Sequence, residues 1–178
     1  MNTIDQFSFL DKKAIIRVDF NVPLNNGKVT DNSRIVAASP TIKKIISDGG
    51  SCILMSHLGR PKGVDQSLSM GNIAKEVERV LGSEILLSKD VVGSDAKSKS
   101  KNLKPGEILL LENLRFHKEE TEGDVAFAEE LSKLADCYIN DAFGTAHRAH
   151  ASTTIIAQFF EHKFFGRLLR SEEHTSEL

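Results

Sequence analysis

The chain has 178 residues and a net charge of −2 at pH 7, enough for one domain and without bulk attraction to nucleic acid or an anionic membrane. Its hydrophobic fraction of 40% and charged fraction of 27% favour a packed globular core over disorder. The sequence shows no signal peptide and no apolar run of membrane-spanning length, and both cysteines, Cys52 and Cys137, lie in apolar runs that suit buried thiols in a reducing compartment. We therefore expect a cytoplasmic protein whose anion-binding sites are local.

Short apolar segments alternate with helical patterns along the chain. Segments rich in Ile, Leu or Val that are too short for helices predict buried strands. These segments are Ala14–Val18, Cys52–Ser56, Glu107–Leu111 and Cys137–Asn140, with a weaker candidate at Glu84–Leu87. After the first strand, Asn25-Asn26-Gly27 predicts a tight hairpin turn.

Apolar residues at helical spacing predict three helices. The helices are Ser33–Ser47, Met70–Leu81 and Asp124–Ala135. Pro40 predicts either a kink in the first helix or the start of a second one, and the Lys/Ser-rich stretch Ser94–Lys104 predicts a solvated helix or loop. Alternating strands and helices predict a doubly wound, Rossmann-like α/β domain with a mainly parallel sheet, in which ligands bind beyond the carboxyl ends of the strands.

Basic side chains follow these predicted strands. Three of the chain's eight arginines fall in the loops after the strands, and a fourth opens the first helix. These arginines are Arg60, Arg115, Arg148 and Arg34. Because the loops share one edge of the sheet, we expect the arginines to converge with His57 on a small ligand that carries several negative charges. Asp19 and Asn21, after the first strand, would accept hydrogen bonds from a ligand hydroxyl or orient an arginine.

Other interpretations of these residues stay open. A loop arginine is ordinarily a solvated surface charge, and His57 alone fits a core histidine. Asp19 could simply pair with Arg17. Arg34 could pair with Asp31, although a cation in the first turn of a helix opposes the helix dipole.

Signals for other chemistry are weak. His147 and His150 are three residues apart, but no Cys or carboxylate completes a ligand set, so we expect no metal site. Lys62 fits an ordinary solvated lysine. No Gly-rich phosphate loop and no nucleophile elbow follows any predicted strand, so the sequence predicts no nucleotide cradle in this chain.

Five motifs together resemble phosphoglycerate kinases, and they occur in that family's order over most of the chain. They are RVDFNVPL at Arg17–Leu24, DNSRIVAASPTI at Asp31–Ile42, SHLGRPKG at Ser56–Gly63, LLENLRF at Leu110–Phe116 and NDAFGTAHRAHAST at Asn140–Thr153. The resemblance implies the amino-terminal half of a two-domain, hinge-bending glycolytic kinase. That enzyme transfers a phosphoryl group between 1,3-bisphosphoglycerate and ADP, giving 3-phosphoglycerate and ATP.

The resemblance also implies roles for individual residues. The implied substrate contacts are Asp19, Asn21, Arg34, His57, Arg60, Arg115 and Arg148. Arg34 is the implied catalytic residue, contacting the substrate carboxyl and then the transferring phosphoryl group. Mg-ATP or Mg-ADP would bind a second domain of the full-length enzyme, so we expect this chain to bind no cofactor, to be inactive alone and to be a monomer.

We interpret residues 1–160 as the phosphoglycerate-binding domain, 161–169 as a degraded lead into the hinge and 170–178 as a non-native tail. The tail RSEEHTSEL matches the translation of a common DNA-sequencing adapter, which predicts a truncated reading frame. Truncation is expected to uncover an apolar patch. Its residues would be Ile155, Ile156, Phe159, Phe160, Phe164 and Phe165.

Two functions of other classes remain as alternatives. One is a stand-alone anion-binding or regulatory domain without catalysis. The other is a nucleic-acid binder with a basic patch, although the acidic balance and the lack of aromatic stacking motifs argue against it.

Overall fold

The computed structural model describes residues 2–142 and 149–166. Arg148 and the tail at residues 170–178 therefore lie outside the described residues. Within the described part, the main sheet has seven parallel strands in the order β1-β9-β8-β2-β5-β7-β6. They are β1 (Asn2–Thr3), β2 (Lys13–Val18), β5 (Ser51–Met55), β6 (Leu86–Leu87), β7 (Ile108–Leu110), β8 (Cys137–Asp141) and β9 (Lys163–Phe165). A separate antiparallel hairpin pairs β3 (Leu24–Asn25) with β4 (Lys28–Val29).

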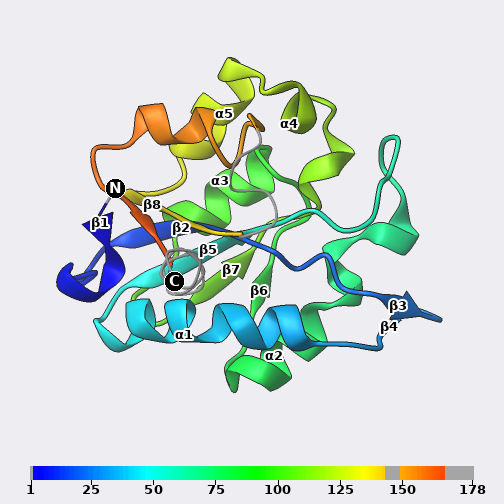
Figure 1. Cartoon of the computed structure of the whole chain (residues 1–178), viewed down its shortest axis with the longest axis horizontal. Coiled ribbons are helices and arrows are strands. Elements are labelled where there is room, and N and C mark those ends of the chain that lie inside the picture. The colour runs from blue at the N-terminus through cyan, green and yellow to red at the C-terminus, as the bar shows by residue number, and fades with distance from the viewer. Residues whose placement is uncertain (1, 143–148, 167–178) are drawn as a thin grey trace, which may run out of the picture.

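Helices cover both faces of the sheet (Figure 1), which confirms the predicted doubly wound α/β fold. One face carries α1 (Ser33–Ser47) and α2 (Ala74–Leu81), and the other carries α3 (Ser94–Lys101), α4 (Glu119–Glu122) and α5 (Val125–Ser132). Short 3-10 helices connect the larger elements. They are η1 (Ile4–Gln6), η2 (Gln66–Leu68), η3 (Met70–Asn72), η4 (Leu114–Phe116) and η6 (Ile155–Phe159).

The alternating side chains of β2 separate two hydrophobic cores. Ala14 and Ile16 pack into the core that includes residues of α1 and α2, whereas Ile15 packs into the core that includes residues of α5 and η6. Because side chains along a strand alternate between faces, Arg17 lies on the same face as Ile15. A charged side chain thus enters an otherwise apolar layer and requires polar partners there.

The strongest local predictions are confirmed, with one ambiguity resolved. α1 is one helix that contains Pro40, so the proline does not begin a second helix. Pro40 lies on the exposed side, where water can satisfy the Val36 carbonyl that loses its helical partner. In the predicted hairpin turn, Asn26 and Gly27 have φ values of 53° and 74°, as a tight two-residue turn requires.

The segment interpreted as a lead into a hinge contributes β9, which lies between β8 and β1. The expected apolar patch is wrong for Ile156, Phe160 and Phe164, which are buried, while the other three candidates are half-buried. The amino-terminal segment supplies cover, because the rings of Phe7 and Phe164 lie 4.7 Å apart. Among the described residues, no helix is long and apolar enough to cross a membrane.

Candidate functional site

Arg34 lies in the first turn of α1, and its side chain reaches back to the residues that follow β2. Its Nη1 donates hydrogen bonds to Asp19 Oδ1 at 3.3 Å and to the Asn21 carbonyl at 2.7 Å. The side chain of Arg34 remains 52% exposed, and that of Asp19 is 24% exposed. We call Arg34, Asp19 and Asn21 the Arg34 cluster. A half-exposed arginine held through a single nitrogen can exchange these contacts for a ligand at small cost.

Asn21 also joins the end of β2 to the loop after β5. Its Oδ1 accepts a hydrogen bond from the Gly59 backbone N–H at 2.8 Å. Gly59 has φ +65°, and a Cβ added there would meet Leu68 Cδ2 at 2.8 Å. The loop that carries His57 and Arg60 therefore favours glycine at this position for its backbone conformation, and a larger residue would also displace the end of the Leu68 side chain.

His57, two residues after the end of β5, is only 6% exposed. Its Nδ1 lies 2.8 Å from Nη2 of Arg17, which is fully buried. Burial, followed by the charges of Arg17 and Arg115, lowers the pKa of His57 to about 3. The ring is therefore neutral at physiological pH.

A carboxylate of α4, on the same face of the sheet as the Arg17 side chain, balances the charge of this buried arginine. Glu120 of α4 is fully buried, with Oε2 4.0 Å from Arg17 Nε. Ser152 lies between them, because its hydroxyl accepts from Arg17 Nε at 2.9 Å and donates to Glu120 Oε2 at 2.5 Å. We call Arg17, His57, Ser152 and Glu120 the buried network.

Asn113, after β7, ties together the loops that follow β5 and β7. Its side-chain oxygen accepts from the backbone N–H groups of Leu58 and Arg115, and its amide donates to the Leu58 carbonyl at 2.8 Å. Asn113 is fully buried, so these bonds are shielded from water. The backbones that carry His57 and Arg115 are thereby held together.

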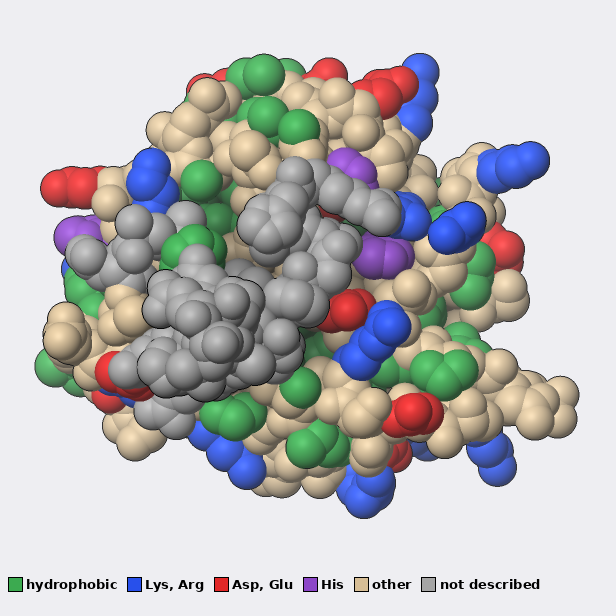
Figure 2. All heavy atoms as spheres, in the orientation of Figure 1, with side chains coloured by type: hydrophobic (Ala, Val, Ile, Leu, Met, Phe, Trp, Pro, Cys, Tyr) green, Lys and Arg blue, Asp and Glu red, His purple; other side chains and the backbone are tan. Residues whose placement is uncertain are grey.

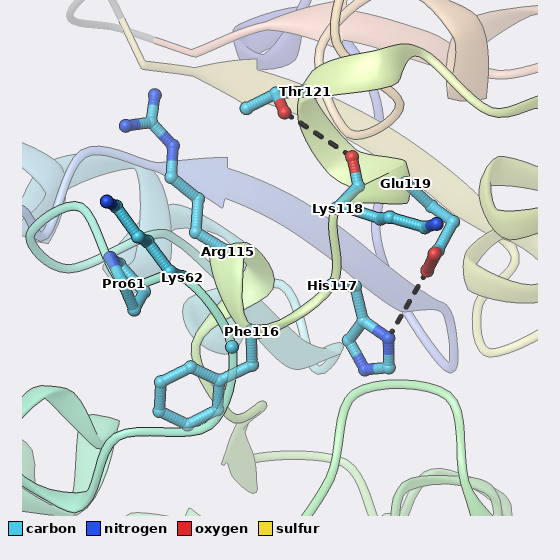
Figure 3. A pocket seen from close by; sticks show the side chains of 9 residues that line it. Pro61, Lys62, Arg115, Phe116, His117, Lys118, Glu119 and Thr121 are labelled. Carbon is cyan, nitrogen blue, oxygen red and sulfur yellow. Dashed lines mark hydrogen bonds and ion pairs between the residues drawn. The ribbon is translucent and has the colours of Figure 1, made fainter.

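The same two loops form a cleft of about 420 Å³ that is lined by basic side chains. Figure 3 shows that the charged ends of Lys62 and Arg115 point in the same direction from opposite loops. His117 lies further along the cleft, 3.6 Å from Glu119. Lys62, interpreted from sequence as an ordinary solvated lysine, thus lines a cleft together with a predicted site residue.

The described site candidates all follow the carboxyl ends of β2, β5 and β7, apart from Arg34 on α1. Asp19, Asn21 and Arg34 are bonded to one another, whereas Arg60 is exposed on its loop. Figure 2 shows histidine and basic side chains together on the right-hand part of the visible face, the side to which the β3–β4 hairpin projects in Figure 1. Arg34 pairs with Asp19 rather than with Asp31.

Sequence reasoning missed the buried network apart from His57. The sequence suggests Arg17 only as a partner for Asp19, yet the structure shows hydrogen bonds from Arg17 to His57 and Ser152. One signal was available: an arginine inside the apolar run AIIRV must be buried, and a buried charge needs a partner. Nothing local identifies that partner, because Glu120 lies more than a hundred residues further along the chain.

Comparisons of the sequence with known proteins all match phosphoglycerate kinases. The phosphoglycerate kinase family model matches residues 4–177. A phosphoglycerate kinase of Porphyromonas gingivalis is 49% identical, over 96% of this chain and 47% of the relative, and one of Moorella thermoacetica is 50% identical, over 97% and 44%. The chain thus spans about half the length of these curated relatives.

Two solved structures of phosphoglycerate kinases share the fold of this chain. The phosphoglycerate kinase of Coxiella burnetii superposes with a TM-score of 0.88 at 35% identity, and that of Pyrococcus horikoshii with 0.89 at 32%. Each match covers 98% of this chain and 44% of the solved chain. The family model, the curated relatives and the solved structures therefore show that this chain belongs to the phosphoglycerate kinase family.

Proposed function

We propose that this chain supplies the 3-phosphoglycerate side of a phosphoglycerate kinase. The complete enzyme would transfer a phosphoryl group reversibly between 1,3-bisphosphoglycerate and ADP in glycolysis, giving 3-phosphoglycerate and ATP. The Arg34 cluster carries the proposal: a half-exposed arginine is held at the carboxyl end of the sheet by Asp19 and Asn21, without being buried. Such an arginine is placed to bind an anion and to follow its charge.

The surrounding residues suit a ligand with a carboxylate and a phosphate. Arg60, Arg115 and Arg148 would provide the remaining positive charge, and Asp19 and Asn21 the acceptors for a hydroxyl. Phosphoryl transfer depends chiefly on alignment and charge stabilisation, so no nucleophile on the protein is required. Arg34 would contact the substrate carboxyl and then spread the negative charge that develops on the transferring group.

We propose that the magnesium nucleotide is not held by the residues described here. No group of three His, Cys, Asp or Glu side chains in residues 2–142 and 149–166 could hold a metal ion. The sequence also lacks a Gly-rich phosphate loop. We assign Mg-ATP and Mg-ADP to the part of the family's length that this chain does not span, and we propose that the chain alone, as a monomer, binds the acceptor substrate without turnover.

A coupled assay tests this assignment. The purified chain with ATP, magnesium and 3-phosphoglycerate is expected to give no turnover above background, while calorimetry detects weak binding of 3-phosphoglycerate. Extension through a second, nucleotide-binding domain should restore turnover, and Arg34→Ala in the extended protein should abolish it again. Alignment of the two substrates can lower the reaction barrier by roughly 7–11 kcal/mol, and a chain that lacks the nucleotide-binding domain loses this contribution entirely.

Three outcomes would contradict the proposal. Turnover by the chain alone would reveal an unrecognised nucleotide site. Undiminished turnover in the extended Arg34→Ala variant would remove Arg34 from the chemistry. No binding of 3-phosphoglycerate to either the chain or the extended protein would leave the stand-alone regulatory domain as the better interpretation.

A further inference from the structure

The buried network lies between the sheet and α4, beneath the candidate site. Arg17 comes from β2, His57 from the end of β5, Glu120 from α4 and Ser152 from the segment just before η6. Arg17, Ser152 and Glu120 are fully buried, and His57 nearly so. Buried charge is costly unless it is paired, so four polar side chains in one apolar layer need a role that offsets this cost.

Each hydrogen bond in the network has a fixed direction. A guanidinium group has only donors, so Arg17 donates both to Ser152 Oγ at 2.9 Å and to His57 Nδ1 at 2.8 Å. The single proton of the Ser152 hydroxyl is then free to go only to Glu120 Oε2, 2.5 Å away. Arg17 therefore stands at the centre and donates toward both ends.

This direction determines where the imidazole proton lies. Nδ1 of His57 must be the unprotonated acceptor, because an N–H there would meet the N–H of Arg17 head on. A neutral ring then carries its proton on Nε2, on the side away from Arg17. Among the described residues, the charges of Arg115, His150 and Arg34 also act on the ring and disfavour a cation there.

Glu120 keeps this arrangement in place. Its carboxylate accepts from both the Ser152 hydroxyl and the Ser152 N–H, the latter at 3.0 Å, and its own carbonyl accepts from Ala151 N–H at 2.9 Å. Three hydrogen bonds thus fix α4 to the segment that carries Ser152. Ser152 is in turn the group that fixes Arg17 Nε.

We propose that Arg17, held by Ser152 and Glu120, is a positioning residue that keeps His57 as the neutral Nε2–H tautomer, so that the site offers the ligand a hydrogen-bond donor at this point instead of a further cation. For its ligand, this inference rests on the proposed function. A neutral donor close to the charges of Arg17, Arg115 and Arg34 adds direction to anion recognition without adding charge repulsion.

The tautomer is tested first without ligand, by nitrogen-15 NMR of the histidine rings in the full chain. The His57 signals are assigned by their absence in His57→Asn. We expect an unprotonated Nδ1, a protonated Nε2 and no titration between pH 5 and 8. An Nδ1–H tautomer, or a ring that titrates near pH 6.5, would overturn the proposal. Ser152→Ala leaves Arg17 and Glu120 in place but removes the acceptor of Arg17 Nε, so it should admit the Nδ1–H tautomer of His57; an unchanged tautomer would contradict the positioning role.

Two matched variants then separate the donor from the acceptor. His57→Gln places an amide N–H near the position of Nε2, whereas His57→Asn places an amide oxygen near Nδ1. We expect His57→Asn to weaken 3-phosphoglycerate binding by between about 10-fold and 100-fold, with His57→Gln closer to the unaltered chain. The reverse order would overturn the proposed donor. If the unaltered chain shows the expected tautomer but binds no 3-phosphoglycerate, the proposed function fails while the tautomer assignment stands.

Discussion

Two arginines lie at the same end of the molecule in opposite environments. Arg17 is fully buried, and Nε, Nη1 and Nη2 each have a partner, whereas Arg34 is 52% exposed and bonds through Nη1 alone. Burial lowers the pKa of Arg17, and Glu120 opposes this shift. A guanidinium that is buried and immobile, as in Arg17, can position its neighbours. A guanidinium that is solvent-exposed and free to move, as in Arg34, is suited to bind a ligand and move with it.

The largest effect is expected from removing the carboxylate of the buried network. Glu120→Ala leaves Arg17 buried without its counter-charge, which should lower the free energy of unfolding by about 3–5 kcal/mol. Urea unfolding measures this, with Glu122→Ala as the matched control, because Glu122 belongs to the same helix but is exposed. If both variants lowered the free energy of unfolding by the same small amount, the buried network would not depend on charge balance, and the contrast between Arg17 and Arg34 would fail.

Substitution of an exposed arginine should change ligand binding instead of stability. Arg60→Ala is expected to weaken 3-phosphoglycerate binding by about 1.5–3 kcal/mol, the value of a hydrogen bond to a charged group. Calorimetry at increasing salt should show this difference shrink, because exposed charges are screened. Arg79→Ala is the control: it is also an exposed arginine, but it pairs with Glu76 on α2. A loss of the same size in Arg79→Ala would reduce the Arg60 effect to bulk charge.

A third effect should appear on lowering the pH. The pKa of His57 is about 3 in the folded chain against 6.5 in the unfolded one, so the unfolded state binds the extra proton between these values. Stability is therefore fully present above pH 6.5 and falls as the pH drops, by up to about 1.4 kcal/mol per pH unit from this group. His57→Asn should lack this slope between pH 6.5 and 5. Identical pH profiles would show that His57 is not held neutral.

The elements that carry the site were predictable because their patterns are strong. β2, β5, β7 and β8 are apolar runs of strand length, and α1 has the apolar spacing of a helix. The rule that ligands bind beyond the strand ends then located Asp19 and His57 at one edge. Arg34 followed from its unfavourable place in the first turn of a helix.

Other parts of the structure have no local signal. β1 and β9 are two and three residues long, too short for alternation to be read. α4 consists of Glu119–Glu122 and has no apolar face, so nothing in the sequence marks Glu120 as buried. Contacts between residues far apart in sequence also escaped prediction, above all the bond of Ser152 to Arg17. Arg148 and the interpretation of residues 170–178 stay predictions.

The smallest effect is expected where the proposed catalytic role is largest. Arg34→Ala removes two hydrogen bonds, but both lie at the surface, and the side chain is half exposed. Surface pairs of this kind contribute little, and Ala favours the helix, so the free energy of unfolding should change by less than about 0.5 kcal/mol. Urea unfolding measures this value beside the Glu120→Ala result. A loss comparable to that of Glu120→Ala would mean that Arg34 is a structural arginine like Arg17. A small loss in stability together with lost turnover in the extended protein would place the role of Arg34 in the reaction, because only a residue that the fold does not need is free to move with the transferring group.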